Sequence, residues 1–258
     1  MKKVFILIIT LLAGYPILNA QEINEDLIEV GIVEHLGDTI PLDLTFLNEE
    51  SDTVTLDELI DKPTILSFVY FDCPGLCSPL LEGVSEAVEK VDMDLGDEYE
   101  VITISFNISD TPEKAKEKKV NFVQQISQEN RNSWHYLTGS QEHIDIITKA
   151  VGFKYKPQGL DFAHPSAIII LSPQGKITRY LYGITFLPFD VKMALIEAQK
   201  GISRPTVNKV LEYCFSYDPE GQGYTLQVTR ITGTIILFFA LIFFATLLIR
   251  KRRKTVKS

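Results

Sequence analysis

Residues 64–77 read TILSFVYFDCPGLC. The first half, residues 64–70, is a continuous apolar run rich in β-branched and aromatic side chains, which is typical of a central strand covered on both faces. Cys73 and Cys77 follow where this strand passes into a helix, which apolar residues at helical spacing predict over residues 76–93. The sequence therefore places two thiols between a buried strand and the start of a helix.

Strands and helices alternate along the rest of the chain. Strands are predicted at residues 99–106, 134–137, 166–171 and 177–182, and helices at residues 110–128, 140–151 and 190–199. Asp110-Thr111-Pro112-Glu113 is a strong helix start, because it combines a capping side chain with proline in the first turn. Residues 27–45 are interpreted as a leading hairpin.

This order of elements predicts an α/β fold with a mixed sheet and helices on both faces. A cysteine pair at the end of the first central strand narrows the prediction to a thioredoxin-like fold, in its peroxiredoxin-like variant. The last two strands, joined by Ser172-Pro173-Gln174-Gly175, are expected to form a hairpin.

Two segments lie outside this predicted fold. Residues 1–20 combine two lysines, an apolar run and a small-residue site, and they are interpreted as a cleaved signal peptide, with an N-terminal anchor as the alternative. Residues 231–249 carry no charge across 19 residues and are followed at once by five cations. A membrane span explains that pattern better than a buried helix or a nucleic-acid patch.

The chain is predicted to consist of a signal peptide (1–20), a thioredoxin-like domain (21–214), a juxtamembrane linker (215–230), a transmembrane helix (231–249) and a basic cytoplasmic tail (250–258). The main domain is expected outside the cytoplasm. Residues 21–230, the part expected outside the cytoplasm, hold all 34 acidic residues and 17 of the 25 basic ones, so the net charge of this part is about 17 minus 34, or −17. Such a surface disfavours nucleic acid and suits metal ions or cationic partners.

Cys73 and Cys77 are separated by three residues, one more than in the C-x2-C of disulfide oxidoreductases. Cβ atoms four residues apart on a helix lie about 5–6 Å from each other, whereas a disulfide needs about 3.5–4.5 Å. A metal ion between two sulfurs tolerates the wider spacing better, and helix N-terminal amides favour thiolates. Two alternatives to a metal site remain. Cys73 and Cys77 could form a disulfide if Pro74-Gly75 makes the first turn of the helix irregular, or they could be two inert thiols.

His164 is the candidate for a third ligand. In a thioredoxin-like fold, the loop that enters the strand at 166–171 faces the cysteine turn and normally carries a cis-proline; whether His164–Pro165 is cis stays open. Asp161 is either an acceptor for the His164 ring or a surface residue of a turn.

The other histidines are not expected to reach the cysteines. His35 and His143 are predicted to be solvated at the surface, and His135 is predicted to pack in its strand. Two thiolates and one imidazole suit copper, as Cu(I) or Cu(II). Zinc is the alternative metal, although structural zinc sites usually have four protein ligands.

Several stretches carry a resemblance to a known family: Phe71-Asp72-Cys73-Pro74-Gly75-Leu76-Cys77, Ile104-Ser105-Phe106 with Thr111-Pro112-Glu113, Trp134-His135-Tyr136-Leu137-Thr138-Gly139, His164-Pro165-Ser166 and Tyr213-Cys214-Phe215-Ser216-Tyr217-Asp218-Pro219. Together they resemble the Sco/SenC copper proteins, in a bacterial branch with a C-terminal membrane anchor, over about residues 31–198. The departures are Ser78, where many members have proline, and the flanks Ala163 and Pro165 of the histidine.

That resemblance implies Cys73, Cys77 and His164 as copper ligands. It also implies delivery of copper to the CuA centre of cytochrome c oxidase, or reduction of the cysteines of that centre. The implied partners are the copper-bearing oxidase subunit and a periplasmic copper donor or thiol reductant. The implied location is the bacterial inner membrane, with one span and the main domain in the periplasm.

Two other functions stay open at this point. A membrane-anchored thiol-disulfide oxidoreductase without copper delivery would use Cys73 and Cys77 as its catalytic pair; beyond such reductase activity, a conventional enzyme is not expected. A peroxidase would need a threonine and an arginine near Cys73, and the sequence around Cys73 does not contain that pattern. Cys214 is expected to be a buried small residue, an auxiliary copper ligand or a resolving thiol.

Overall fold

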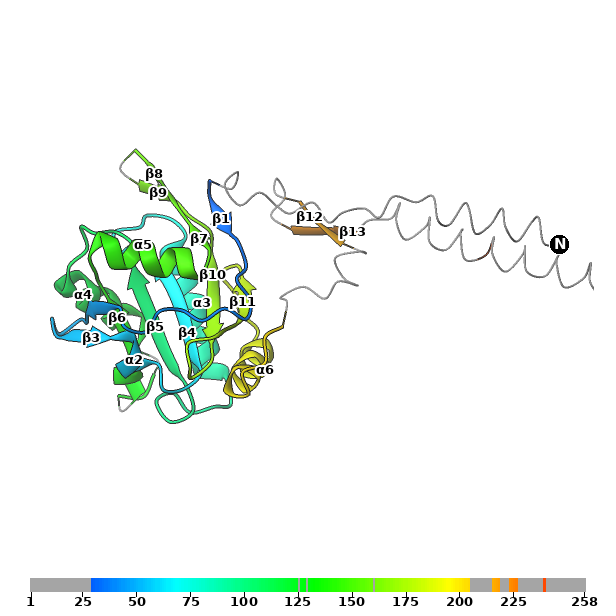
Figure 1. The fold of residues 1–258 in the computed structure, drawn as a ribbon, viewed down its shortest axis with the longest axis horizontal. Coiled ribbons are helices and arrows are strands. Elements are labelled where there is room, and N and C mark those ends of the chain that lie inside the picture. The colour runs from blue at the N-terminus through cyan, green and yellow to red at the C-terminus, as the bar shows by residue number, and fades with distance from the viewer. Residues whose placement is uncertain are drawn as a thin grey trace, which may run out of the picture. The chain divides into compact units, whose positions relative to one another are not determined.

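The computed structural model describes residues 29–124, 126–128, 130–159, 161–204, 215–218 and 223–226, with residue 239 (Figure 1). The chain divides into two units, Met1–Ser203 and Arg204–Ser258. The predicted signal peptide, Cys214 and nearly all of the predicted span at 231–249 lie outside the described residues. Within the described part of the chain, no helix has the length and apolar character that a membrane span requires.

The first unit is built on a mixed five-stranded sheet in the order β11-β10-β4-β5-β6. Strands β4 (Thr64–Val69), β5 (Glu100–Ser105) and β6 (Trp134–Leu137) run parallel. Strand β10 (Ala167–Leu171) runs antiparallel to both β4 and β11 (Ile177–Tyr182). The predicted mixed sheet and the predicted final hairpin are therefore confirmed.

Four longer helices cover this sheet. They are α3 (Cys77–Lys90), α4 (Pro112–Phe122), α5 (Gln141–Ala150) and α6 (Pro188–Gln199). Helix α3 contacts both α4 and α6, so these three form one layer. Figure 1 shows α5 across the other face of the sheet, which confirms that helices lie on both faces.

Local sequence explains why these elements form where they do. Every residue of β4 and β5 is buried, and for β4 the continuous apolar run predicts this burial. The hydroxyls of Ser67 and Thr103 hydrogen-bond each other at 2.9 Å inside the sheet. Thr111 caps α4 ahead of Pro112, and Ser140 caps α5, so both predicted helix starts are confirmed.

Short elements surround this sheet. They are β1 (Gly31–Ile32), β2 (Thr45–Leu47), β3 (Thr53–Thr55), α2 (Leu56–Leu59), the 3-10 helix η2 (Asn130–Ser133), β7 (Phe153–Lys154), β8 (Lys156–Gln158) and β9 (Asp161–Ala163). The predicted hairpin over residues 27–45 is wrong. Instead, β1 pairs with the distant β7, and the hairpin is formed by β2 and β3.

The second unit contains a two-stranded antiparallel hairpin of β12 (Phe215–Asp218) and β13 (Gly223–Leu226). It falls in the segment that the sequence predicts as a polar linker. Residues 219–222, between the two strands, lie outside the described residues.

Candidate metal centre

The two cysteines occupy different positions at the start of α3. The chain leaves β4 at Val69, and Cys73 lies in the loop that follows, half-buried. Cys77 is the first residue of α3 and its relative exposure is 0%. Both side chains are free thiols. Cys77 therefore forms the inner side of the site, and Cys73 its accessible side.

The Cys73 sulfur is held by backbone donors. The N–H groups of Gly75 and Cys77 both point at Sγ of Cys73, each at 3.4 Å. Burial raises the pKa of this thiol, but hydrogen bonds from the Cys77 side chain and from these two amides outweigh burial. The pKa of Cys73 consequently lies below its ordinary value, which favours a thiolate at a helix N-terminus.

The Cys77 thiol has the opposite tendency. Burial is the main cause that raises its pKa, and the neighbouring Cys73 adds to the rise. A hydrogen bond with the Tyr70 backbone and the positive charge of Lys118 act in the other direction. In the metal-free protein Cys77 is accordingly the protonated partner of the pair.

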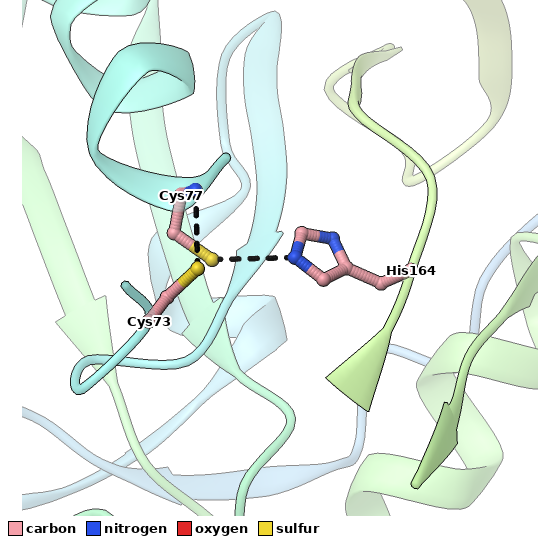
Figure 2. Close-up of side chains that lie close together, drawn as sticks. All are labelled: Cys73, Cys77 and His164. Atoms are coloured by element: carbon pink, nitrogen blue, oxygen red, sulfur yellow. Dashed lines mark hydrogen bonds between the residues drawn. The ribbon is translucent and has the colours of Figure 1, made fainter. Parts of the chain in front are cut away.

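His164 faces the two cysteines and completes the cluster (Figure 2). It lies between β9 and β10, and its Nε2 is 3.5 Å from Sγ of Cys77. Its Nδ1 lies 2.9 Å from the carbonyl oxygen of Pro165, which can only accept, so Nδ1 carries the proton. The lone pair of Nε2 therefore faces the sulfurs. No cis peptide bond occurs in the described residues, so His164–Pro165 is trans.

Aromatic rings surround the imidazole of His164. The ring centroids of Phe106, Tyr70 and Phe153 lie 5.3, 6.0 and 6.5 Å from that of His164. Burial lowers the pKa of His164, with partial opposition from the hydrogen bond to Pro165. The imidazole is therefore neutral near pH 7, which is the form that binds a metal ion.

The three candidate ligand atoms lie within 4.8 Å of one another. Two sulfurs and one imidazole nitrogen form a soft donor set, and such a set fits copper. Within the part of the chain described by the structure, no fourth Cys, His, Asp or Glu joins this group. A closed four-ligand zinc site is therefore not formed by these residues.

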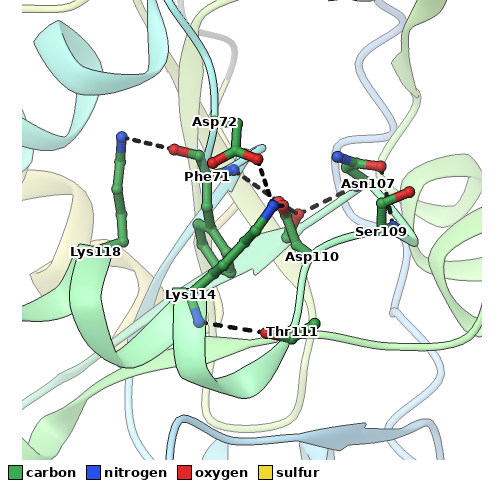
Figure 3. A network of polar contacts seen from close by, with 9 residues as sticks. Phe71, Asp72, Asn107, Ser109, Asp110, Thr111, Lys114 and Lys118 are labelled. Atoms are coloured by element: carbon green, nitrogen blue, oxygen red, sulfur yellow. Dashed lines mark hydrogen bonds and ion pairs between the residues drawn. The ribbon is translucent and has the colours of Figure 1, made fainter.

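A network of charged side chains fixes the loop that carries Cys73 (Figure 3). Asp110, two residues before α4, accepts hydrogen bonds through Oδ2 from the Phe71 backbone at 2.7 Å and from the Ser105 hydroxyl at 2.6 Å. Lys114 forms an ion pair with Asp72 and lies 3.7 Å from Oδ1 of Asp110. Helix α4 thereby holds the loop before the first cysteine.

The part of the chain that carries this site is similar to a known protein family. The sequence model of the SCO1/SenC family matches residues 35–188, more than half of the chain, and this match includes all three candidate ligands. The chain belongs to the SCO1/SenC family. The predicted family is thus confirmed.

Individual relatives resemble the same part of the chain. The SCO1 protein homolog of Bacillus subtilis is 26% identical over 153 residues, which cover 57% of this chain and 75% of the relative. A crystal structure of a protein from Aquifex aeolicus VF5, provisionally assigned to electron transfer, matches with a TM-score of 0.59 and 26% identity, over 64% of this chain and 95% of that one. Arabidopsis thaliana ScoI, solved with copper bound, matches with a TM-score of 0.52 and 20% identity, over 64% of this chain and 98% of that one.

The remaining histidines of this SCO1/SenC protein lie outside the cluster, as expected. His35 and His143 are less solvated than predicted, because their Nδ1 atoms contact the carbonyl oxygens of Ala150 at 2.9 Å and Thr45 at 2.7 Å. His135 lies in β6 as predicted, with Nε2 3.5 Å from Glu100.

Residues around the cluster include some that sequence reasoning missed. Asp161 does not bind the His164 ring; it accepts a hydrogen bond from the Tyr70 hydroxyl at 3.3 Å. Burial raises the pKa of Tyr70, and interactions with Cys73 raise it further. Neither Tyr70 nor Lys118 stands out in the sequence, because Tyr70 continues the apolar run of β4 and Lys118 is one of several lysines in α4.

Proposed function

We propose that this protein binds copper through Cys73, Cys77 and His164 and transfers it to the CuA centre of a respiratory cytochrome oxidase. The observation that carries the proposal is the convergence of two free thiols and an imidazole lone pair within 4.8 Å. Membership of the SCO1/SenC family and the copper bound to Arabidopsis ScoI support it. The oxidase as target comes from the resemblance to Sco/SenC proteins.

The different exposure of the three ligands suits transfer of a bound copper ion to another protein. Cys77 is fully buried, whereas Cys73 and His164 are half-buried. A ligand on the receiving protein can therefore approach from the side of Cys73 and His164 and replace them in turn. Cys77 would release the ion last, because the partner reaches it last.

Reduction of the partner's cysteines is the second candidate function. The lowered pKa of Cys73 and its accessibility favour it as the attacking thiolate. Cys73 would attack a partner disulfide to form a mixed disulfide and release one partner thiolate. Cys77 would then attack the mixed disulfide, so that the partner gains two electrons and this protein is left with a Cys73–Cys77 disulfide.

Metal analysis of the purified full-length protein tests copper binding. We expect one copper per chain in the wild type, intense sulfur-to-Cu(II) absorption, and loss of both in Cys73→Ala and Cys77→Ala. His164→Ala should weaken binding and shift the absorption, whereas His143→Ala, which removes a ring outside the cluster, should change neither. Wild-type protein without copper, or His164→Ala indistinguishable from His143→Ala, would refute the three-ligand site.

A trapping experiment separates delivery from reduction. Cys77→Ser leaves Cys73 as the attacking thiolate without its resolving partner. If reduction operates, this variant should accumulate a mixed disulfide with a CuA-domain disulfide, and Cys73→Ser should not. Copper transfer without any trapped adduct would support delivery alone.

The proposed organisation places this chemistry outside the cytoplasm. It consists of a signal peptide (1–20), the site-bearing domain (21–214), a linker (215–230), a span (231–249) and a cytoplasmic tail (250–258). The uncharged run at 231–249 and the cations that follow it support this arrangement. A C-terminal reporter active only in the cytoplasm should be active, and the same reporter fused after Ser203 should be inactive.

A further inference from the structure

Lys118 reaches both ends of the loop that carries the two cysteines. It projects from α4, and its Nζ donates to the Phe71 carbonyl and to the Ser78 hydroxyl, each at 3.1 Å. Phe71 lies two residues before Cys73, and Ser78 directly follows Cys77. One ammonium group therefore links the entry and the exit of the ligand loop (Figure 3 shows the contact with Phe71).

The charge of Lys118 is not neutralised in the way that its neighbours' charges are. On the same helix, Lys114 pairs with Asp72, Lys116 with Glu50, and Lys119 with Glu49. Among the described residues, Lys118 forms no ion pair with a carboxylate, and its two hydrogen-bond partners are neutral.

The surroundings of Lys118 preserve the effect of its charge. Its side chain is half-buried, and Nζ lies 5.8 Å from the centroid of the Phe122 ring. Partial burial weakens solvent screening, so the ammonium acts on nearby charge more strongly than a surface lysine does. Both candidate sulfur ligands lie in the loop between the two residues that Lys118 contacts.

We propose that Lys118 is the countercharge of the metal centre and that it favours Cu(I) over divalent ions. This role follows from charge balance and rests on the proposed copper function. Two thiolates and a neutral imidazole give a complex of charge −1 with Cu(I) and of charge 0 with a divalent ion. A fixed cation beside the sulfurs stabilises the first complex more than the second.

Lys118→Gln tests the proposal because it keeps a side-chain N–H donor while removing the charge. The measurements on full-length protein are Cu(I) affinity, by competition with bathocuproine disulfonate without oxygen, and Co(II) affinity, by titration with cobalt chloride. We expect Lys118→Gln to weaken Cu(I) binding about tenfold more than Co(II) binding. Lys118→Arg should restore the wild-type ratio, and Lys116→Gln, which removes an exposed charge from the same helix, should leave that ratio unchanged.

A purely structural role predicts a different result. If Lys118 only holds the loop, Lys118→Gln will weaken Cu(I) and Co(II) equally or not at all, and the proposal is overturned while the copper function stands. Wild-type protein that binds no Cu(I) would overturn the copper function and this inference with it. If Lys118→Gln does not fold, Lys118→Met, which also removes the charge, takes its place, and an unchanged Cu(I)-to-Co(II) ratio in that variant overturns the proposal.

Discussion

Replacing Asp110 by alanine removes the carboxylate that ties α4 to the start of the cysteine loop. The side chain of Asp110 is completely buried, and its Oδ2 accepts hydrogen bonds from the Phe71 N–H and the Ser105 hydroxyl. After the substitution both donors stay buried and lose their acceptor. We therefore expect a large loss of stability together with a displaced loop.

The expected magnitude follows from these two bonds. Leaving a buried donor without its charged acceptor costs about 1.5–2.5 kcal/mol for each of the two bonds. The ion pair with Lys114 adds little, because that lysine is 38% exposed and also pairs with Asp72. The free energy of unfolding should fall by about 3–5 kcal/mol, which at a urea m-value of about 2 kcal/mol/M lowers the midpoint by roughly 1.5–2.5 M.

Trp134 provides the assay. It is the only tryptophan of the chain, it is fully buried, and its indole N–H donates to Thr103 at 2.9 Å, so its fluorescence reports on the centre of the sheet. Asp92→Ala is the matched control, since Asp92 pairs with Lys192 at the surface and should leave the urea midpoint unchanged. An Asp110→Ala midpoint equal to that of Asp92→Ala would refute the assigned role.

Two further outcomes are expected. Alkylation by iodoacetamide, followed by peptide mass spectrometry, should reach half its maximum at a lower pH for Cys73 than for Cys77, because the thiolate reacts and the two pKa values are shifted in opposite directions; equal titration of both thiols would contradict this. Gly83→Ala should destabilise the protein, because its Cβ would lie 2.0 Å from the Ile184 carbonyl oxygen, whereas Gly75→Ala, with open space around it, should not; equal thermal unfolding temperatures for the two variants would argue against that contact.

Local features of the fold were predictable because a few neighbouring residues encode them. Thr111 and Pro112 define a helix start through one capping hydroxyl and one fixed φ angle. The buried strand at 64–70 was predicted from an apolar run in the same way. The pairing of β1 with β7 was missed, because it joins short segments far apart in the chain and no local pattern marks their contact.

In the candidate site too, local features were predictable and contacts between distant segments were not. Cys73 and Cys77 were identified from spacing and from their place after a strand, and His164 from its place before another. The structure brings the His164 ring to the sulfurs, as predicted. It also shows that Asp161 binds Tyr70 instead of the imidazole, because the Pro165 carbonyl already accepts the Nδ1 proton.

The sequence alone determined the soft ligands, their spacing and the elements that carry them, since these depend on residue identity and short-range periodicity. Only the tertiary structure decided which thiol is buried, which imidazole nitrogen faces the sulfurs, and that Lys118 places its ammonium group against both ends of the cysteine loop. Burial, ring orientation and electrostatic field depend on segments that meet only when α4, β4 and β10 pack together, and no stretch of sequence contains that information by itself.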